Sequence, residues 1–263
     1  MRKKTLLLFI AALLLTGCAG KNNTSEQTTK SESPATDAVV ETTTEAPTEA
    51  PTAIGHTDNN TSPFSMTYLG HASVKLVTKS GYVIYVDPYQ SPADYSQPAD
   101  LILVTHGHSD HNVVSLCTTK DNTQIITHKE ALADGKYNKF SFDGVEIEAV
   151  PAANDNHRIN ECVGYIISFD GITIYHAGDT SKLNEMTLLK DRNIDIAMYP
   201  IDGKYNMDAK EASECAEIVG APFNIPIHDY DLPSEPKKSL NFNATGKTVL
   251  EYGETIKLDS YTR

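Results

Sequence analysis

From residue 64 onward, apolar residues either alternate with polar ones or form short runs, and this pattern predicts a strand-rich domain. Helical periods occur between the strand-like runs, which indicates an α/β mixture with two similar halves. We expect strands at residues 65–69, 74–78, 82–86, 101–104, 124–127, 145–150, 163–169, 172–175, 194–199, 222–227, 248–252 and 255–258. We expect helices near residue 113, from residue 129, and at residues 183–189 and 209–219.

The first residues predict an export signal. Three basic residues at positions 2–4 precede an apolar run at 6–15, which is too short to span a bilayer comfortably and is typical of a secretory signal peptide. The run ends in Leu15-Thr16-Gly17-Cys18, which resembles a bacterial lipobox. An ordinary signal peptide or a short anchor, with Cys18 incidental, is the alternative. We expect residues 1–17 to be a lipoprotein signal peptide and Cys18 to carry a lipid that anchors an exported protein to the outer face of a bacterial membrane.

The composition then changes to Thr, Ser, Glu, Asn, Pro and Ala. Residues 18–62 contain too little apolar surface to offset the entropy of ordering the chain, so the sequence predicts a disordered acidic stalk there. Its expected role is to hold the following domain away from the membrane. Residues 63–263 remain, which is enough chain for one domain with a sizeable core.

The strongest chemical signal directly follows the predicted strand at 101–104, where four potential metal ligands lie within six residues: His106, His108, Asp110 and His111. Imidazole and carboxylate groups are ligands that zinc prefers, and a loop leaving a rigid strand can aim them. His106 and His108 can chelate one ion, while Asp110 and His111 are placed to reach a second. A solvated His-rich loop or core histidines are the alternatives, but the density of ligands favours metal. A zinc finger is disfavoured because no CxxC pair is present.

Charge and cysteine content narrow the function further. The chain has 22 basic and 35 acidic residues and a formal charge of −13, which argues against a nucleic acid as partner. Beyond Cys18, the three cysteines Cys117, Cys162 and Cys215 are an odd number for an oxidising compartment. The sequence therefore indicates no disulfide framework, and burial as small apolar side chains is the favoured interpretation.

Several separated motifs together resemble the metallo-β-lactamase superfamily, and among its branches the lactonase-like and N-acylphosphatidylethanolamine-phospholipase-D-like hydrolases. The motifs are Leu69-Gly70-His71-Ala72-Ser73, Val86-Asp87-Pro88, Ala99-Asp100-Leu101 through His111, Tyr175-His176-Ala177-Gly178-Asp179-Thr180, Gly203-Lys204-Tyr205-Asn206-Met207-Asp208 and Ile225-Pro226-Ile227-His228. The resemblance covers residues 65–258 and implies an α/β fold, a four-layer αββα sandwich with the metals at one edge between two sheets.

The resemblance also implies roles for particular residues. It makes His106 and His108 the pair on the first metal, and Asp110, His111 and His228 ligands of the second, with Asp179 as the carboxylate between them. Asp110 is in addition the candidate to orient the attacking group or shuttle its proton. Asp179 and His228 each follow a predicted strand, so each can present a ligand from a strand end.

One segment departs from the pattern of many members of the superfamily, which carry a third histidine for the first metal where this chain has Asn154. The nearest imidazole is His157. His157, the amide oxygen of Asn154 or water could complete the first site, or a single metal could bind tightly. We expect His71 near the site, as a substrate contact or as a residue behind the ligands.

Three other side chains carry weaker expectations. A structural role is at least as well supported as a ligand role for His176, and we assign none to His128 or to His56 in the stalk. Tyr95 is a candidate for the mouth of the pocket.

These observations predict a lipid-anchored hydrolase that uses one or two zinc ions, with manganese or iron as alternatives. A metal-bound hydroxide would attack an ester, lactone, amide or phosphodiester of a small molecule or lipid. The alternative is a non-catalytic lipoprotein that holds metal for binding or sensing, which would have a closed site with no open position for water. The sequence gives neither the substrate nor the oligomeric state.

Overall fold

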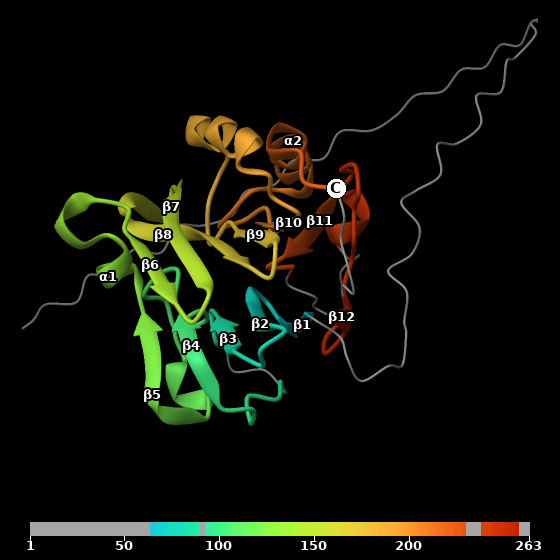
Figure 1. Cartoon of the computed structure of the whole chain (residues 1–263). Helices are drawn as coiled ribbons and strands as arrows, with labels where there is room; N and C mark the ends of the chain where they lie inside the picture. Colours follow the sequence, from blue (N-terminus) through green and yellow to red (C-terminus); the bar gives the residue numbers. More distant parts are fainter. Residues whose placement is uncertain (1–63, 90–92, 230–237, 258–263) are drawn as a thin grey trace, which may run out of the picture. The chain divides into compact units, whose positions relative to one another are not determined.

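The computed structural model describes residues 64–89, 93–229 and 238–257 (Figure 1). The predicted signal peptide, the lipid attachment site at Cys18, the stalk and His56 lie outside these residues. Within the described ranges, no helix is both long and apolar enough to cross a membrane. Two six-stranded sheets form the body of the domain.

The first sheet has the strand order β12-β1-β2-β3-β4-β5. Its antiparallel part joins β12, β1, β2 and β3, while β3, β4 and β5 run parallel. The strands are β1 (Ser65–Gly70), β2 (Ser73–Val77), β3 (Val83–Val86), β4 (Ala99–Leu103), β5 (Thr119–Ile126) and β12 (Thr255–Lys257).

The second sheet has the order β11-β10-β9-β8-β7-β6. Strands β6 to β9 are antiparallel neighbours, and β9, β10 and β11 run parallel. The strands are β6 (Lys139–Phe142), β7 (Val145–Asn154), β8 (His157–Phe169), β9 (Ile172–His176), β10 (Ile196–Pro200) and β11 (Phe223–Ile227).

The main apolar core is formed by residues of both sheets, and strand β4 illustrates how the sequence builds it. Leu101 and Leu103 belong to this core, whereas Ile102 between them packs in a separate cluster on the other face of the sheet. Successive side chains of a strand point to opposite faces, so an uninterrupted apolar run fits a strand that is covered on both sides.

Different elements cover the two outer faces. Helix α2 (Ala209–Val219) and the 3-10 segment η3 (Asn184–Arg192) pack in one apolar cluster with residues of β9 and β10, and Figure 1 shows them above the second sheet. The first sheet is covered more thinly, by the loop around Tyr95 and the 3-10 turn η1 (Val114–Leu116). This is the metallo-β-lactamase type of α/β sandwich that the sequence predicted, with one helical layer reduced.

The ends of α2 follow directly from the sequence. The carboxylate of Asp208 caps the first turn by accepting a hydrogen bond from the backbone N–H of Glu211 at 2.8 Å. Gly220 ends the helix in the left-handed conformation, with φ 73°, which glycine adopts without strain.

Some predicted elements differ in the structure. Residues 248–252 do not form a strand but lead into a turn at Gly253. Thr248 N–H donates to Asn224 O of β11, beside the bridge at Lys247. The helix expected at 183–189 is the 3-10 segment η3, and β6 was not predicted. The remaining short elements are α1 (His128–Ala131), η2 (Ala133–Gly135) and η4 (Lys238–Asn241).

All three cysteines in the described ranges are buried, and none is part of a disulfide there. Burial raises the pKa of the Cys117 thiol and of the Cys215 thiol to about 12. They therefore behave as small apolar side chains, as expected.

Candidate metal centre

The candidate ligands lie at one edge of the two sheets, because they follow the ends of strands that run in the same direction. Loops that leave parallel strands at their carboxyl ends meet at one edge. The His-rich loop follows β4, Asp179 follows β9 and His228 follows β11. His157 reaches the same edge from the start of β8, next to the end of β7. In the described part of the chain, every group of three or more potential metal ligands lies here.

A first group consists of His106, His108 and His157, whose ligand atoms all lie within 4.8 Å of one another. His106 and His157 are buried, while His108 is exposed. His157 Nε2 lies 3.0 Å from His108 Nδ1. The structure thus places His157 beside the pair that the sequence assigned to a first metal.

A second group consists of His71, Asp110, His111 and His228, again within 4.8 Å. His71 Nε2 lies 3.3 Å from Asp110 Oδ2, and the ring of His71 packs 3.8 Å from that of His228. Asp110 is the most accessible member, with a side chain 33% exposed. His71 therefore lies within the cluster and not behind it.

Asp179 lies between the two groups. Its Oδ2 is 3.9 Å from His106 Nε2, and its Oδ1 is 3.3 Å from His111 Nε2 and 3.4 Å from His228 Nε2. A carboxylate in this position can contact ions on both sides. The arrangement corresponds to the role that the resemblance implied for Asp179.

Several ligand atoms in this cluster lack an ordinary partner. His106 Nε2, His111 Nε2 and Asp179 Oδ1 are buried, and none of them has a hydrogen-bond partner among the described residues. An unsatisfied buried polar atom costs about 1–3 kcal/mol, so three in one place need an explanation. Divalent ions bound in the two groups would satisfy these atoms, and imidazole with carboxylate is a donor set that suits zinc. The residues therefore fit a metal centre.

Asp87, which follows β3, orients the ligands of the His-rich loop from behind. It is fully buried and accepts hydrogen bonds from Thr105 N–H and Thr105 Oγ1, each at 2.7 Å. His111 Nδ1 lies 2.8 Å from Asp87 Oδ2 and donates to it, which leaves Nε2 free to bind a metal. Asp87 thus fixes both the orientation and the tautomer of His111.

Asp202, which follows β10, does the same for His228. His228 Nδ1 is 3.0 Å from Asp202 Oδ2, and both side chains are buried. The other carboxylate oxygen of Asp202 accepts from the backbone N–H of Lys204 at 2.8 Å. A carboxylate behind a ligating histidine raises the basicity of the ring, which strengthens metal binding.

Asn154 has the corresponding position behind His157. Its Oδ1 accepts from the backbone N–H groups of Asn156 at 2.8 Å and His157 at 2.9 Å, and it also lies 3.0 Å from His157 Nδ1. The amide oxygen that could have served as a ligand is therefore already used in holding His157. Of the alternatives left open by the sequence, this geometry favours His157 as the third ligand and Asn154 as its support.

Burial and the crowding of imidazoles lower the pKa values of His106 and His157. Burial, followed by the neighbouring His111, holds the pKa of His106 well below its ordinary value, and burial with His108 lowers the pKa of His157 to about 4. Burial raises the pKa of Asp179 to about 7. These histidines are neutral at pH 7, which is the state in which imidazole binds a metal.

His228 is the exception among the histidines. Burial lowers its pKa, but hydrogen bonding to Asp202 and the charge of Asp179 outweigh burial, so its pKa is raised. The carboxyl of Asp202 responds in the opposite direction: burial would raise its pKa, but the contacts with His228 and backbone N–H groups hold it well below the ordinary value. The opposite shifts are those expected for an imidazole and a carboxylate in contact.

The backbone of the site is unusual at three of these positions. His71, Asp87 and His228 have φ values of 57°, 47° and 55°, a left-handed conformation that costs non-glycine residues free energy. The N–H of His228 donates to His71 O at 2.7 Å, which links two of these residues. Gly178 is needed for close packing, because a Cβ there would lie 2.6 Å from Val163 O.

Three weaker expectations have clear outcomes. His176 is fully buried, with Nε2 donating to Ala72 O at 2.8 Å and Nδ1 accepting from Gly178 N–H at 3.2 Å, so it has a structural role. His128 belongs to none of the ligand groups. The expectation for Tyr95 was wrong: it is 5% exposed and packs under the first sheet, where its hydroxyl pairs with Ser73 Oγ at 2.9 Å.

The sequence interpretation assigned no role to Asp87, to Asp202 or to Asn206, whose Nδ2 donates to Asp202 Oδ2 at 2.7 Å. A signal existed for the first two, because each acidic residue directly follows an apolar strand that ends at the same edge as the ligands. Asn206 lies in one of the motifs of the resemblance, but its role depends on contacts across the fold, such as that with Asn154.

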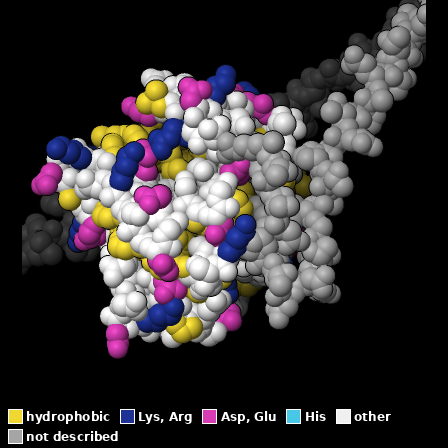
Figure 2. Space-filling model, viewed as in Figure 1, with side chains coloured by type: hydrophobic (Ala, Val, Ile, Leu, Met, Phe, Trp, Pro, Cys, Tyr) yellow, Lys and Arg dark blue, Asp and Glu magenta, His cyan; other side chains and the backbone are white. Residues whose placement is uncertain are grey.

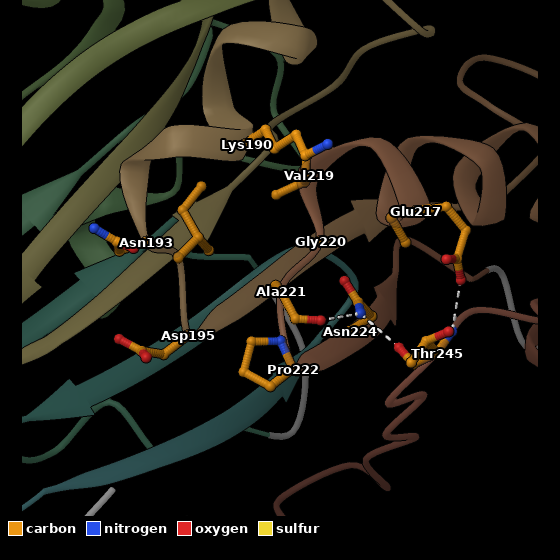
Figure 3. Close-up of a pocket in the computed structure, with 12 residues that line it drawn as sticks. Lys190, Asn193, Asp195, Glu217, Val219, Gly220, Ala221, Pro222, Asn224 and Thr245 are labelled. Carbon is orange, nitrogen blue, oxygen red and sulfur yellow. Dashed lines mark hydrogen bonds between the residues drawn. The ribbon is translucent and has the colours of Figure 1, made fainter. Parts of the chain in front are cut away.

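Two cavities differ in their distance from the candidate ligands. One of about 200 Å³ is lined by His71, with Tyr68, Asp229, Glu251 and Tyr252 among the other residues. The other, of about 390 Å³, lies at the opposite ends of β10 and β11, where Asn224 donates to Ala221 O and Thr245 O, each at 2.7 Å (Figure 3). Only the first adjoins the ligands.

The face of the molecule shown in Figure 2 carries acidic and basic side chains that are interspersed. Neither sign of charge dominates the described surface that is visible in this view.

Comparisons with known proteins agree with this geometry. A family model described as "Beta-lactamase superfamily domain" matches residues 65–228. The chain is 30% identical over 208 residues to a "UPF0173 metal-dependent hydrolase" of Methanospirillum hungatei, an alignment that covers 70% of this chain and 94% of the relative. A protein of the same description from Thermococcus onnurineus is 31% identical over 221 residues, covering 73% and 98%.

Solved structures give the same result. A proposed metal-dependent hydrolase from Parabacteroides distasonis is similar with a TM-score of 0.59 and 32% identity, covering 71% of this chain and 91% of the other. Igni18, a metallo hydrolase from Ignicoccus hospitalis, has a TM-score of 0.61 and 23% identity, covering 75% and 99%. The second likeness concerns the fold alone, because fold similarity does not determine activity.

Proposed function

Because this chain belongs to the beta-lactamase superfamily and is a metal-dependent hydrolase, we propose that it is a binuclear enzyme, with zinc as the expected metal, that cleaves an ester, lactone, amide or phosphodiester. The observation that carries the proposal is the position of Asp179 between two groups of ligands, with buried ligand atoms of His106, His111 and Asp179 that have no other partner. A structural metal site would need only one such group.

The residues divide into two sets in this proposal. His106, His108 and His157 would hold the first ion, and His111, His228 and Asp110 the second, with Asp179 shared. His71 contacts Asp110 and packs on His228, so it can position both or serve as a further ligand. When bound, the ions would supply a water of lowered pKa and positive charge for the oxyanion that develops at the scissile group.

Asp110 is the candidate for proton transfer. Hydrogen bonding from His71 holds its pKa well below the ordinary value, so its carboxylate is ionised at neutral pH. It is also accessible, with 33% of its side chain exposed. A carboxylate at this point can accept the proton of the attacking water and pass it to the leaving group.

We place the substrate in the cavity of about 200 Å³ that His71 lines. This cavity adjoins the second ligand group and has both polar and apolar walls, including Tyr68, Val249 and Tyr252. A small substrate, or one end of a larger one such as a lipid, could enter it.

The experiment that tests the proposal is a hydrolysis screen. Purified full-length protein would be assayed on chromogenic esters, lactones, amides and phosphodiesters, beside His108→Ala and Asp110→Ala. We expect turnover of one class and its loss in both variants, with circular dichroism unchanged because these residues lie on a loop. Retained turnover in both variants would exclude this site.

We also propose that the protein is exported and anchored through a lipid on Cys18. The basic residues at positions 2–4, the short apolar run and the Leu-Thr-Gly-Cys end support this. Cys18→Ser should prevent incorporation of labelled fatty acid and move the protein out of the membrane fraction. A wild-type protein without fatty acid would refute the anchor but leave the hydrolase proposal intact.

A further inference from the structure

Three hydrogen bonds followed by one ion-pair contact connect the two ligand groups behind the candidate ligands. From His157 Nδ1 this chain of contacts passes to Asn154 Oδ1 at 3.0 Å, and from Asn154 Nδ2 to Asn206 Oδ1 at 2.7 Å. It continues from Asn206 Nδ2 to Asp202 Oδ2 at 2.7 Å and ends at His228 Nδ1, 3.0 Å from the same oxygen. The chain joins the turn between β7 and β8 to the loop that follows β10.

The direction of every bond in this chain is fixed by its partners. Asn154 Oδ1 faces two backbone N–H groups, which can only donate, so its other amide atom must be the NH₂ group. Asn206 turns its NH₂ group to the carboxylate of Asp202, which can only accept while ionised. Both amide orientations are therefore determined.

These directions have a consequence for the histidines at the two ends. An amide oxygen behind His157 and a carboxylate behind His228 both require a proton on Nδ1, which leaves the lone pair on Nε2. The Nε2 atoms are those that face His108 in the first group and Asp179 in the second. One network therefore sets the same tautomer in both groups.

We infer that Asn206 is a positioning residue that couples the two metal-binding groups, acting on His157 through Asn154 and on His228 through Asp202. Asn206 also acts on Asp179, the carboxylate between the groups, because its side chain lowers the pKa of Asp179, against the larger effect of burial. Its single side chain therefore reaches the support of each group and the residue they share. The inference rests on the proposed binuclear function.

The neighbouring Asn156 provides a matched control. Its Nδ2 donates to Tyr205 O at 3.1 Å, so it joins the same two loops as Asn154 and Asn206 do. Its side chain is exposed, and its hydrogen bond is to Tyr205 O and not to a candidate ligand. If Asn206 only held the loops together, Asn156→Ala and Asn206→Ala would have similar effects.

The test is a titration of metal-free full-length protein with Co²⁺, followed by visible absorption and calorimetry. We expect wild type to bind two ions, and Asn206→Ala to bind both at least about tenfold more weakly, as is usual when residues behind metal ligands are removed. Asn156→Ala should stay within about twofold. Asn206→Ser, which cannot span both partners, should behave like Asn206→Ala and serves if that variant does not fold.

The outcomes separate the inference from the proposed function. If wild type binds fewer than two ions, the binuclear function fails and the inference with it. If wild type binds two ions but Asn206→Ala weakens only one or neither, the coupling is refuted while the binuclear function stands. If Asn156→Ala weakened metal binding as much as Asn206→Ala does, Asn206 would have only a structural role, and the coupling would also be refuted.

Discussion

The two ligand groups differ in the side chains that support them from behind. In the second group, the buried carboxylates of Asp87 and Asp202 support His111 and His228. In the first group, the neutral amide of Asn154 supports His157, and His108 is exposed. A carboxylate makes the ring it supports a more basic ligand than an amide does. The second group should therefore bind its metal more tightly, and the first should exchange it more readily.

Replacing the residue shared by both groups should have the largest effect. Asp179→Asn removes the negative charge between the groups, so we expect loss of both metals. Hydrolysis should fall by at least about a thousandfold, because several kcal/mol of charge stabilisation depend on the ions. Steady-state kinetics with metal analysis measures this, and Asp191→Asn, at an exposed position, is the control. Near-normal activity in Asp179→Asn would remove the basis for treating the groups as one centre.

His157→Ala tests whether His157 belongs to the first group. It removes a candidate ligand, so the first ion should bind more than about a hundredfold more weakly, beyond the usual cost of losing a residue behind a ligand. The second ion should be much less affected. Calorimetric titration with Zn²⁺ distinguishes the two events. Equal weakening of both sites would mean that His157 does not belong to the first group.

Asp202→Asn tests whether the charge behind the ring determines metal affinity, because it gives His228 a neutral supporting amide like that behind His157. The affinity of the second group should fall about 10- to 100-fold, towards that of the first. Competition with a chelator of known affinity would measure it. An unchanged affinity would show that the charge behind the ring is not what separates the two groups.

The smallest effect should come from a substitution in an ion-pair cluster that lies outside both ligand groups. Arg192 Nη1 donates to Glu148 Oε1 at 2.9 Å, and Lys139 lies 2.9 Å from Oε2. Hydrogen bonding from Arg192, more than that from Lys139, lowers the pKa of Glu148 from 4.5 to about 2. The native carboxylate therefore stabilises the fold above about pH 4.5, and this contribution disappears as the pH falls through about 2.

Glu148→Gln should accordingly lower the free energy of unfolding by about 1 kcal/mol at pH 7, a modest value because the cluster is partly exposed. The difference from wild type should shrink between about pH 5 and 2. Urea unfolding at several pH values measures it, and metal content should not change. A difference that grows on acidification would contradict the sign of the pKa shift.

The sequence predicted the fold class because long apolar runs and strand periods are local signals. It also placed the ligands of the His-rich loop, Asp179 and His228 at strand ends, where the structure brings them together. It missed β6, whose residues, Lys139–Phe142, are exposed or only partly buried and so give no apolar run. It assigned a strand to 248–252 because apolar residues recur there, although Val249 and Tyr252 are exposed.

The supporting residues were harder to predict, because their roles depend on contacts between distant segments. Asn154 and Asn206 are 52 positions apart, and nothing near either residue in the sequence indicates their hydrogen bond. The same holds for the choice between Asn154 and His157 as the third ligand. The two residues that flank the turn between β7 and β8 offered an amide and an imidazole, and only the backbone N–H groups facing the amide oxygen decided between them.

The central claim is that two metal ions share one centre, and metal content tests it most directly. Inductively coupled plasma mass spectrometry on full-length protein, purified without chelator or added metal, would be run beside His108→Ala and His228→Ala. We predict close to two equivalents of zinc, or of manganese or iron, in the wild type. His108→Ala should lose mainly the ion of the first group and His228→Ala that of the second. Absence of metal in the wild type, even after reconstitution, would contradict the account.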